Sequence, residues 1–196
     1  MAWSIWDIVF VVGFVIYIGI RGQFEKKTRG QEKVTHRGGA WDIALMVLVA
    51  IGALLLPILY LFTPLLSFAD YQLPMWMPWC GTAIMLSALW LFWRSHAGLG
   101  KNWSVTLELR REHELVTHGV YRRIRHPMYA AIFLFGIAQG MLLANWLAGW
   151  SAFVCFAVMY LVRFPREERM MVDQFGDEYR AYMRRSGRIF PRIGMV

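Results

Sequence analysis

The chain has few charged residues and few cysteines. Only 17 % of its 196 residues are charged, whereas 58 % are hydrophobic and 16 % are aromatic. Soluble domains carry about 25 % charged residues, so this composition excludes an ordinary soluble domain. The two cysteines, Cys80 and Cys155, lie in apolar runs without disulfide or metal-ligand spacing. The pattern therefore predicts neither a disulfide framework nor a metal site.

Basic residues are absent from three stretches of the chain. Residues 1–20, the connection at 68–73 and the surroundings of Asn145 contain no Lys or Arg; all 21 basic residues fall in 21–40, 94–127 and 163–192. Because Lys and Arg concentrate in cytoplasmic loops, we expect an integral membrane protein with its N-terminus outside and its basic segments in the cytoplasm. This pattern explains the net charge of +8 without a nucleic-acid partner.

Long apolar runs predict an all-α, integral membrane fold. Several runs approach the roughly 20 apolar residues that cross a bilayer, and the N-terminus lacks the features of a cleaved signal peptide. We expect a single domain over 1–196 with five membrane spans, a cytoplasmic insert and a cytoplasmic tail. The spans are expected at 3–20, 41–68, 75–93, 128–143 and 146–164, the insert at 94–127 and the tail at 165–196.

Prolines and glycines refine these expectations. Pro57 and Pro64 interrupt the second run, which is long enough to cross once with a kink. Gly136 and Gly140, spaced four apart, predict close approach of the last two helices. Pro165 is expected to end the last span. The tail after it has apolar residues at helical spacing, Met171, Phe175, Tyr179 and Tyr182, and is expected to form an amphipathic helix against the membrane or over the insert.

A polar stretch, HELVTHGVYRRIRHPMY at 113–129, lies between apolar runs. Within it, His126 precedes Pro127, which fixes the backbone at the start of the fourth span, and Arg125 and Tyr129 flank this turn. Free N–H groups at a helix N-terminus favour anionic ligand groups. His126 is therefore either part of a ligand site or a satisfied structural group.

A second charged cluster, Arg163, Glu167 and Glu168, lies at the end of the last span. An Arg four residues before a Glu also forms a simple intrahelical ion pair, which is the structural alternative. Ionisable groups at the end of a membrane helix are functional candidates. Arg163 suits an anionic head group or carboxylate, and Glu167 suits a cationic or hydroxyl-bearing ligand.

Together these residues resemble the isoprenylcysteine carboxyl methyltransferase family, in particular its small archaeal and bacterial members with five spans. The resemblance covers about residues 98–192, and the combination of motifs is more specific than any one of them. The motifs are LGKNWS at 99–104, HELV at 113–116, GVY at 119–121, RHPMY at 125–129, the EE pair at 167–168 and FGDEY at 175–179.

The resemblance implies S-adenosylmethionine-dependent methyl transfer at the cytoplasmic face, to the carboxylate of a lipophilic, isoprenylcysteine-like acceptor that enters from the membrane lipids. Arg163 corresponds to the family's substrate-binding arginine and Asn145 to the polar residue of the hairpin turn; with Glu167 they are the expected catalytic residues. The implied cofactor-binding residues are His113, Glu114, Leu115, Val116, Tyr121, His126, Pro127, Met128, Tyr129, Glu167 and Glu168.

Two alternatives stay open at this point. The RHPxY and EE motifs also resemble phospholipid N-methyltransferases, whose amine acceptor must lose a proton; Glu168 or His126 would then serve as the base. The third reading is a non-enzymatic membrane protein that binds lipid, against which the intact cofactor positions argue. The larger eukaryotic family members have additional N-terminal spans that this chain lacks, which leaves the choice between a carboxylate and an amine acceptor open.

Overall fold

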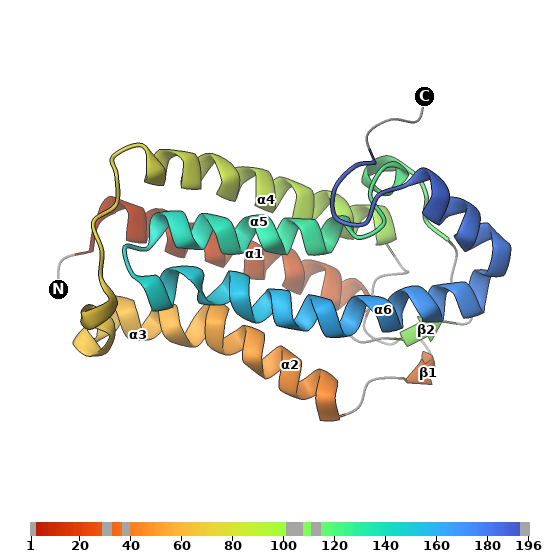
Figure 1. The fold of residues 1–196 in the computed structure, drawn as a ribbon, viewed down its shortest axis with the longest axis horizontal. Helices are drawn as coiled ribbons and strands as arrows, with labels where there is room; N and C mark the ends of the chain where they lie inside the picture. The colour runs from red at the N-terminus through yellow and green to blue at the C-terminus, as the bar shows by residue number, and fades with distance from the viewer. Residues whose placement is uncertain (1–2, 29–32, 37–39, 101–107, 111–114, 193–196) are drawn as a thin grey trace.

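The computed structural model describes residues 3–28, 33–36, 40–100, 108–110 and 115–192. Over these residues the chain forms a bundle of long helices (Figure 1). The long helices are α1 (Ile5–Thr28), α4 (Met77–Leu99), α5 (Pro127–Leu142) and α6 (Trp146–Arg185). A further helical run consists of α2 (Ala40–Ala50), the π-helical η1 (Ile51–Leu55) and α3 (Leu56–Phe62). The short 3-10 helices are η2 (Pro64–Ala69) and η4 (Gly119–Arg122).

The predicted all-α class is confirmed for the body of the molecule. One small departure is an antiparallel pair of strands, β1 (Lys33–His36) and β2 (Glu108–Arg110). These strands connect two basic segments that are far apart in the sequence. The sequence analysis did not predict this pairing.

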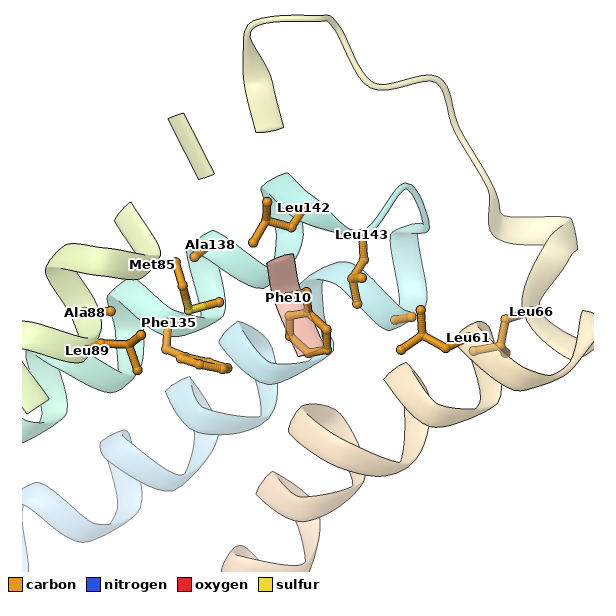
Figure 2. Packing of buried hydrophobic residues seen from close by; sticks show 11 residues of the cluster. Phe10, Leu61, Leu66, Met85, Ala88, Leu89, Phe135, Ala138, Leu142 and Leu143 are labelled. Carbon is orange, nitrogen blue, oxygen red and sulfur yellow. The ribbon is translucent and has the colours of Figure 1, made fainter. Parts of the chain in front are cut away.

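Helix packing buries a core along the middle of the bundle. Helix α4 packs against α1 and α5, α5 packs against α6, and α6 packs against the run from α2 to α3. Figure 2 shows Phe10, Met85 and Phe135 meeting in this core. Large apolar side chains also cover the outside, for example Leu86 and Leu161, each 64 % exposed. Such a surface suits lipid rather than water.

Three helical segments are long and apolar enough to cross a membrane, judged by length and composition. They are Ile5–Lys26, Ala40–Phe62 and Trp146–Arg185. Helix α5 is a shorter apolar helix of 16 residues. Together with the apolar exterior, these helices identify an integral membrane protein.

The two ends of the bundle are formed by different segments, and the basic segments lie at only one of them. At one end, Trp3 Nε1 donates to the Leu61 carbonyl (3.0 Å), and the Tyr71 amide donates to the Ala144 carbonyl (3.0 Å). The other end carries the last turns of α1 and α4, the strands, η4 and the start of α5 (Figure 1). The three segments that hold the basic residues therefore meet at one end of the molecule.

The helix that contains Pro57 continues through it. In the π-helical turn the Leu56 amide donates to the carbonyl five residues earlier, that of Ile51. In the same pattern residue 57 would donate to the Gly52 carbonyl, but Pro57 has no N–H. The Gly52 carbonyl instead accepts from Gln139 Nε2 (3.1 Å) and Ser151 Oγ (2.6 Å). Within the expected 41–68 span, α3 stops at Phe62 and Pro64 begins the separate helix η2.

The predicted close approach of α5 and α6 is confirmed. A Cβ atom at Gly136 would lie 2.9 Å from Phe153 Cα, and one at Gly140 would lie 2.6 Å from the Trp150 ring. Real Cβ atoms do not approach other atoms this closely. Only glycine allows the two backbones to pack at this distance.

Helix α6 continues through Pro165, where the sequence analysis expects the last membrane span to end. Helix α6 runs for 40 residues and breaks its helical geometry at Gly176 instead, where φ is 53°. An interior proline costs a helix about 3 kcal/mol. Contacts of the following residues with the insert outweigh this cost, since Tyr179 and Tyr182 are buried and the Tyr182 hydroxyl donates to the Tyr121 carbonyl. Of the two expected positions for this segment, these contacts fit the one over the insert.

Candidate active site

The C-terminal segment of the chain holds the turn before α5 in place through backbone hydrogen bonds. The Arg125 amide donates to the Gly187 carbonyl (2.8 Å), the His126 amide donates to the Arg188 carbonyl (2.9 Å), and the Gly187 amide donates to the Arg123 carbonyl (2.9 Å). These bonds tie the turn to the C-terminal segment, and the His126 side chain makes no capping hydrogen bond to α5. The imidazole instead stacks on the Tyr129 ring, at a centroid distance of 5.4 Å.

Helix α6 brings both glutamates of the EE pair to this imidazole. His126 Nδ1 lies 3.7 Å from Glu167 Oε2, and His126 Nε2 lies 3.4 Å from Glu168 Oε1. Tyr129 is within electrostatic reach of Glu167 and of the buried Arg163. The structure thus brings together the two clusters that the sequence showed about forty residues apart.

Glu168 is committed to a buried ion pair. Arg125 Nε donates to Glu168 Oε1 (3.0 Å), and both side chains are at least nine-tenths buried. The same guanidinium donates to the Met183 carbonyl (3.2 Å) and to the Ser186 carbonyl. Burial alone would raise the pKa of the Glu168 carboxyl, but His126 and Arg125 outweigh burial and hold this pKa below its ordinary value. A carboxylate held in this way is a poor base.

Glu167 Oε2 and His126 Nε2 are buried without a hydrogen-bond partner among the described residues. The distance from His126 Nδ1 to Glu167 Oε2 is too long for a hydrogen bond, and the contact of His126 Nε2 with Glu168 Oε1 at 3.4 Å does not meet the criteria for one. Buried polar atoms are satisfied in most structures, so exceptions indicate a missing ligand or water. A ligand with amino or hydroxyl donors, such as S-adenosylmethionine, would supply what Glu167 lacks. The residues therefore fit this cofactor.

Tyr121 positions the loop rather than facing the ion pairs directly. Its hydroxyl donates to the Ser95 carbonyl on α4 (3.2 Å), and its carbonyl accepts from Tyr182. Burial raises the pKa of Tyr121 well above its ordinary value, so the hydroxyl stays protonated. Glu167 is near enough to act on it electrostatically.

The remaining expected cofactor residues surround this turn or fall outside what can be described. Pro127 is fully buried at the start of α5, and Met128 beside it is half-buried. Leu115 and Val116 are half-buried just before η4. His113 and Glu114 lie outside the described residues.

Asn145 is not brought together with the other expected catalytic residues. It lies past the far end of α5, whose 16 residues span about 24 Å. Its side-chain oxygen accepts from the Leu147 and Ala148 amides, and its Nδ2 donates to the Leu66 carbonyl and to Asp70 Oδ1. These bonds make it the N-cap of α6 and a tie to the loop at Asp70.

The sequence analysis missed the contribution of Ser186–Arg188. These residues pair with the turn before His126, about sixty positions earlier, and no local pattern signals such a pairing. Arg188 and Glu168 help to line an open groove with a volume of about 400 Å³. The groove is lined by Phe164, Pro165, Glu168, Arg169, Val172, Asp173, Met183 and Arg188. The Arg188 guanidinium lies over the Phe164 ring, 4.8 Å from its centroid.

Comparison with known proteins gives the same family from sequence and from fold. The model of the isoprenylcysteine carboxyl methyltransferase family matches residues 80–173. Protein-S-isoprenylcysteine O-methyltransferase of Schizosaccharomyces pombe is 30 % identical over 89 residues, which are 45 % of this chain and 38 % of that protein. Protein-S-isoprenylcysteine O-methyltransferase B of Arabidopsis thaliana is 31 % identical over 88 residues, 44 % of this chain and 45 % of that protein. The matches thus span less than half the length of these relatives.

A solved structure shares the fold over most of the chain. It is that of the eukaryotic intramembrane Ras methyltransferase ICMT, with a TM-score of 0.58 and 22 % sequence identity, covering 94 % of this chain and 68 % of that one. The matched sequence region contains both halves of the site, the turn at His126 and the pair at Glu167 and Glu168. The family resemblance predicted from the motifs is confirmed: residues 80–173 of this chain are similar to the isoprenylcysteine carboxyl methyltransferase family.

Proposed function

We propose that the protein is an S-adenosylmethionine-dependent methyltransferase that acts on a lipophilic acceptor, with methyl-esterification of an isoprenylcysteine-like carboxylate as its reaction. The observation that carries this proposal is the pair of unpartnered buried atoms, Glu167 Oε2 and His126 Nε2, at the polar end of an apolar bundle. These two atoms indicate a binding site for a polar ligand in a protein whose outer surface is largely apolar.

The cofactor is proposed to bind between the turn at His126 and Glu167. The bound cofactor supplies a methyl group on a positively charged sulfur. Glu167 accepts hydrogen bonds from the amino or hydroxyl groups of the cofactor, and the Tyr129 ring fixes the orientation of His126. The other proposed contacts are those of the family motifs: His113, Glu114, Leu115, Val116, Tyr121, Pro127, Met128 and Glu168.

Arg163 is proposed to hold the acceptor carboxylate. Its side chain is buried on the same helix as Glu167, one turn closer to the middle of the bundle. A planar guanidinium is well shaped for a carboxylate. A carboxylate acceptor needs no base, so the protein mainly has to align it with the methyl donor; such positioning is worth about 7–11 kcal/mol. The low pKa of Glu168 fits this reaction better than one that needs a strong base.

The proposed arrangement in the membrane has five spans with the site at the cytoplasmic face and the N-terminus outside. The meeting of the basic segments at one end of the bundle supports it. The lipid tail of the acceptor then reaches the site from the bilayer, between helices, while Glu167 remains on the polar side. A single domain over residues 1–196 carries both the cofactor site and the acceptor site.

The chemical nature of the product tests this proposal. Purified full-length protein is incubated with methyl-labelled S-adenosylmethionine and either a farnesylated cysteine analogue or phosphatidylethanolamine, and the product is treated with base. We expect label on the cysteine analogue that base releases as volatile methanol, the signature of a methyl ester. Base-stable label on the phospholipid would instead establish N-methylation, with His126 as the base to examine.

Arg163→Ala is expected to abolish turnover and to leave cofactor binding unchanged, because Arg163 is assigned to the acceptor alone. The measurements are the rate of ester formation and the Kd of S-adenosylhomocysteine by calorimetry. Arg166→Ala is the matched control, since Arg166 is exposed on the next turn of α6. Unchanged turnover in Arg163→Ala would move the acceptor site elsewhere.

A further inference from the structure

Apart from Glu168, the residues of the groove on α6 have no role in the proposed function. The groove has a volume of about 400 Å³ and lies between the middle of α6 and the C-terminal segment that returns beside it. Its apolar lining consists of Phe164, Pro165, Val172 and Met183, and its charged lining of Glu168, Arg169, Asp173 and Arg188. Such a lining suits a ligand that has both an apolar and a charged part.

The end of the groove nearest the apolar half of α6 carries a positive charge. The Arg188 guanidinium lies there, over the Phe164 ring at 4.8 Å, and its side chain is 53 % exposed. Glu168 offsets little of this charge, because its carboxylate is already paired with Arg125 at 3.0 Å, whereas Arg188 is 3.8 Å away. Asp173, the other acidic residue of the lining, is more than two turns further along α6 than Phe164. A negatively charged ligand group is therefore favoured at the end near Arg188.

The groove continues the lipid-facing side of α6. No charged residue precedes Arg163 in this helix, and Val158 and Leu161 are 43 % and 64 % exposed, so both face the membrane lipids. Pro165 and Arg169 follow Leu161 at intervals of four residues, which keeps them on the same face. Arg169 is about 12 Å past Leu161, and its side chain leans back toward the start of the helix. Because the headgroup layer of one leaflet is about 5–7 Å thick, Arg169 is placed to reach it.

We infer that this groove binds the phosphate of an anionic phospholipid from the adjacent leaflet. Arg169 and Arg188 line the same groove and donate to the phosphate oxygens, for which planar guanidinium groups are well shaped. Phe164 and Met183 contact the glycerol and the first carbons of the acyl chains, which then follow Leu161 into the membrane. A zwitterionic phospholipid also carries a cation that the two arginines repel, so a lipid with net negative charge binds better. This inference goes beyond the proposed function and does not depend on methyl transfer.

The test is a titration of the detergent-solubilised full chain with phosphatidylglycerol or phosphatidylcholine, in which native mass spectrometry measures the Kd of the first bound lipid. We expect the wild-type protein to bind phosphatidylglycerol about tenfold more tightly or better, the value of one charge-assisted hydrogen bond. Arg169→Gln should weaken binding of phosphatidylglycerol about tenfold and leave binding of phosphatidylcholine unchanged. Arg180→Gln is the matched control, because Arg180 is an exposed arginine of the same helix that pairs with Asp177 outside the groove lining. It should bind both lipids as the wild-type protein does.

Equal affinity of the wild-type protein for the two lipids would overturn the inference, and this comparison needs no variant. Equal losses in Arg169→Gln and Arg180→Gln would overturn it as well, since net charge rather than the groove would then set the affinity. The compound sn-glycerol 3-phosphate has the phosphate without acyl chains and should not displace the lipid at equal concentration; displacement would establish a site for soluble phosphates instead. Failure of the proposed function is seen separately, as absence of methyl transfer with these lipid affinities unchanged.

Discussion

Glu167→Ala is expected to weaken binding of S-adenosylhomocysteine by about 10- to 100-fold, the value of one charge-assisted hydrogen bond. In the structure Glu167 Oε2 is buried and accepts no hydrogen bond from the described residues, and His126 Nδ1 at 3.7 Å is too distant. The protein alone therefore gains little from this oxygen, whereas a cofactor that donates to it gains a full bond. The measurement is calorimetric titration of the purified variant.

The same reasoning predicts that Glu167→Ala does not reduce stability. Removal of the unsatisfied Oε2 atom takes away a desolvation cost, which offsets the loss of the side-chain contact between Glu167 and Tyr129. The thermal midpoint in detergent should stay the same or rise slightly. Glu178→Ala is the matched control for loss of a carboxylate from α6, because Glu178 is exposed and should change neither quantity. Wild-type affinity in Glu167→Ala would remove this residue from the cofactor site.

Arg125→Ala is expected to cost about 3–5 kcal/mol of unfolding free energy, since it leaves the Glu168 charge buried without its main partner. Arg125 also donates to the Met183 and Ser186 carbonyls, so the segment after Gly176 loses these two hydrogen bonds to the turn. Two other basic side chains are more distant from Glu168: His126 lies at 3.4 Å and the half-exposed Arg188 at 3.8 Å. Chemical unfolding in mixed micelles measures the change.

The structure offers a control for this prediction on the same helix. Arg180 and Asp177 form an ion pair of 2.9 Å, comparable to the 3.0 Å of Arg125 and Glu168, but Asp177 is almost fully exposed. Arg180→Ala should have little measurable effect, because exposed ion pairs are screened by water and salt. The double variant Arg125→Leu/Glu168→Leu should recover much of the loss, since it removes both charges. Equal effects of Arg125→Ala and Arg180→Ala would show that burial does not decide the strength of the pair.

Short-range patterns in the sequence were sufficient for the family, the helices and half of the site. Apolar runs of membrane length have few alternatives to helix, because backbone polar groups in lipid must bond within their own segment. Glycines spaced four apart at 136 and 140 indicate one face of a helix, and that face does pack against α6. The motif around His126 also follows from local order, since it lies at the start of α5, whereas Glu167 lies inside α6.

Contacts between distant residues decided the rest. Pro165 locally favours the end of a helix, but the pairing of Arg125 with Glu168 and the burial of Tyr182 keep α6 intact to Gly176. Asn145 has the chemistry of a catalytic residue, and only the length of α5 separates it from the site. The sequence by itself determined which segments are helical and which residues are polar, because both depend on neighbours along the chain. Tertiary packing decided which polar residues are satisfied and which lack a partner, because burial and hydrogen bonding depend on partners as far apart as the 99 residues between Gly52 and Ser151.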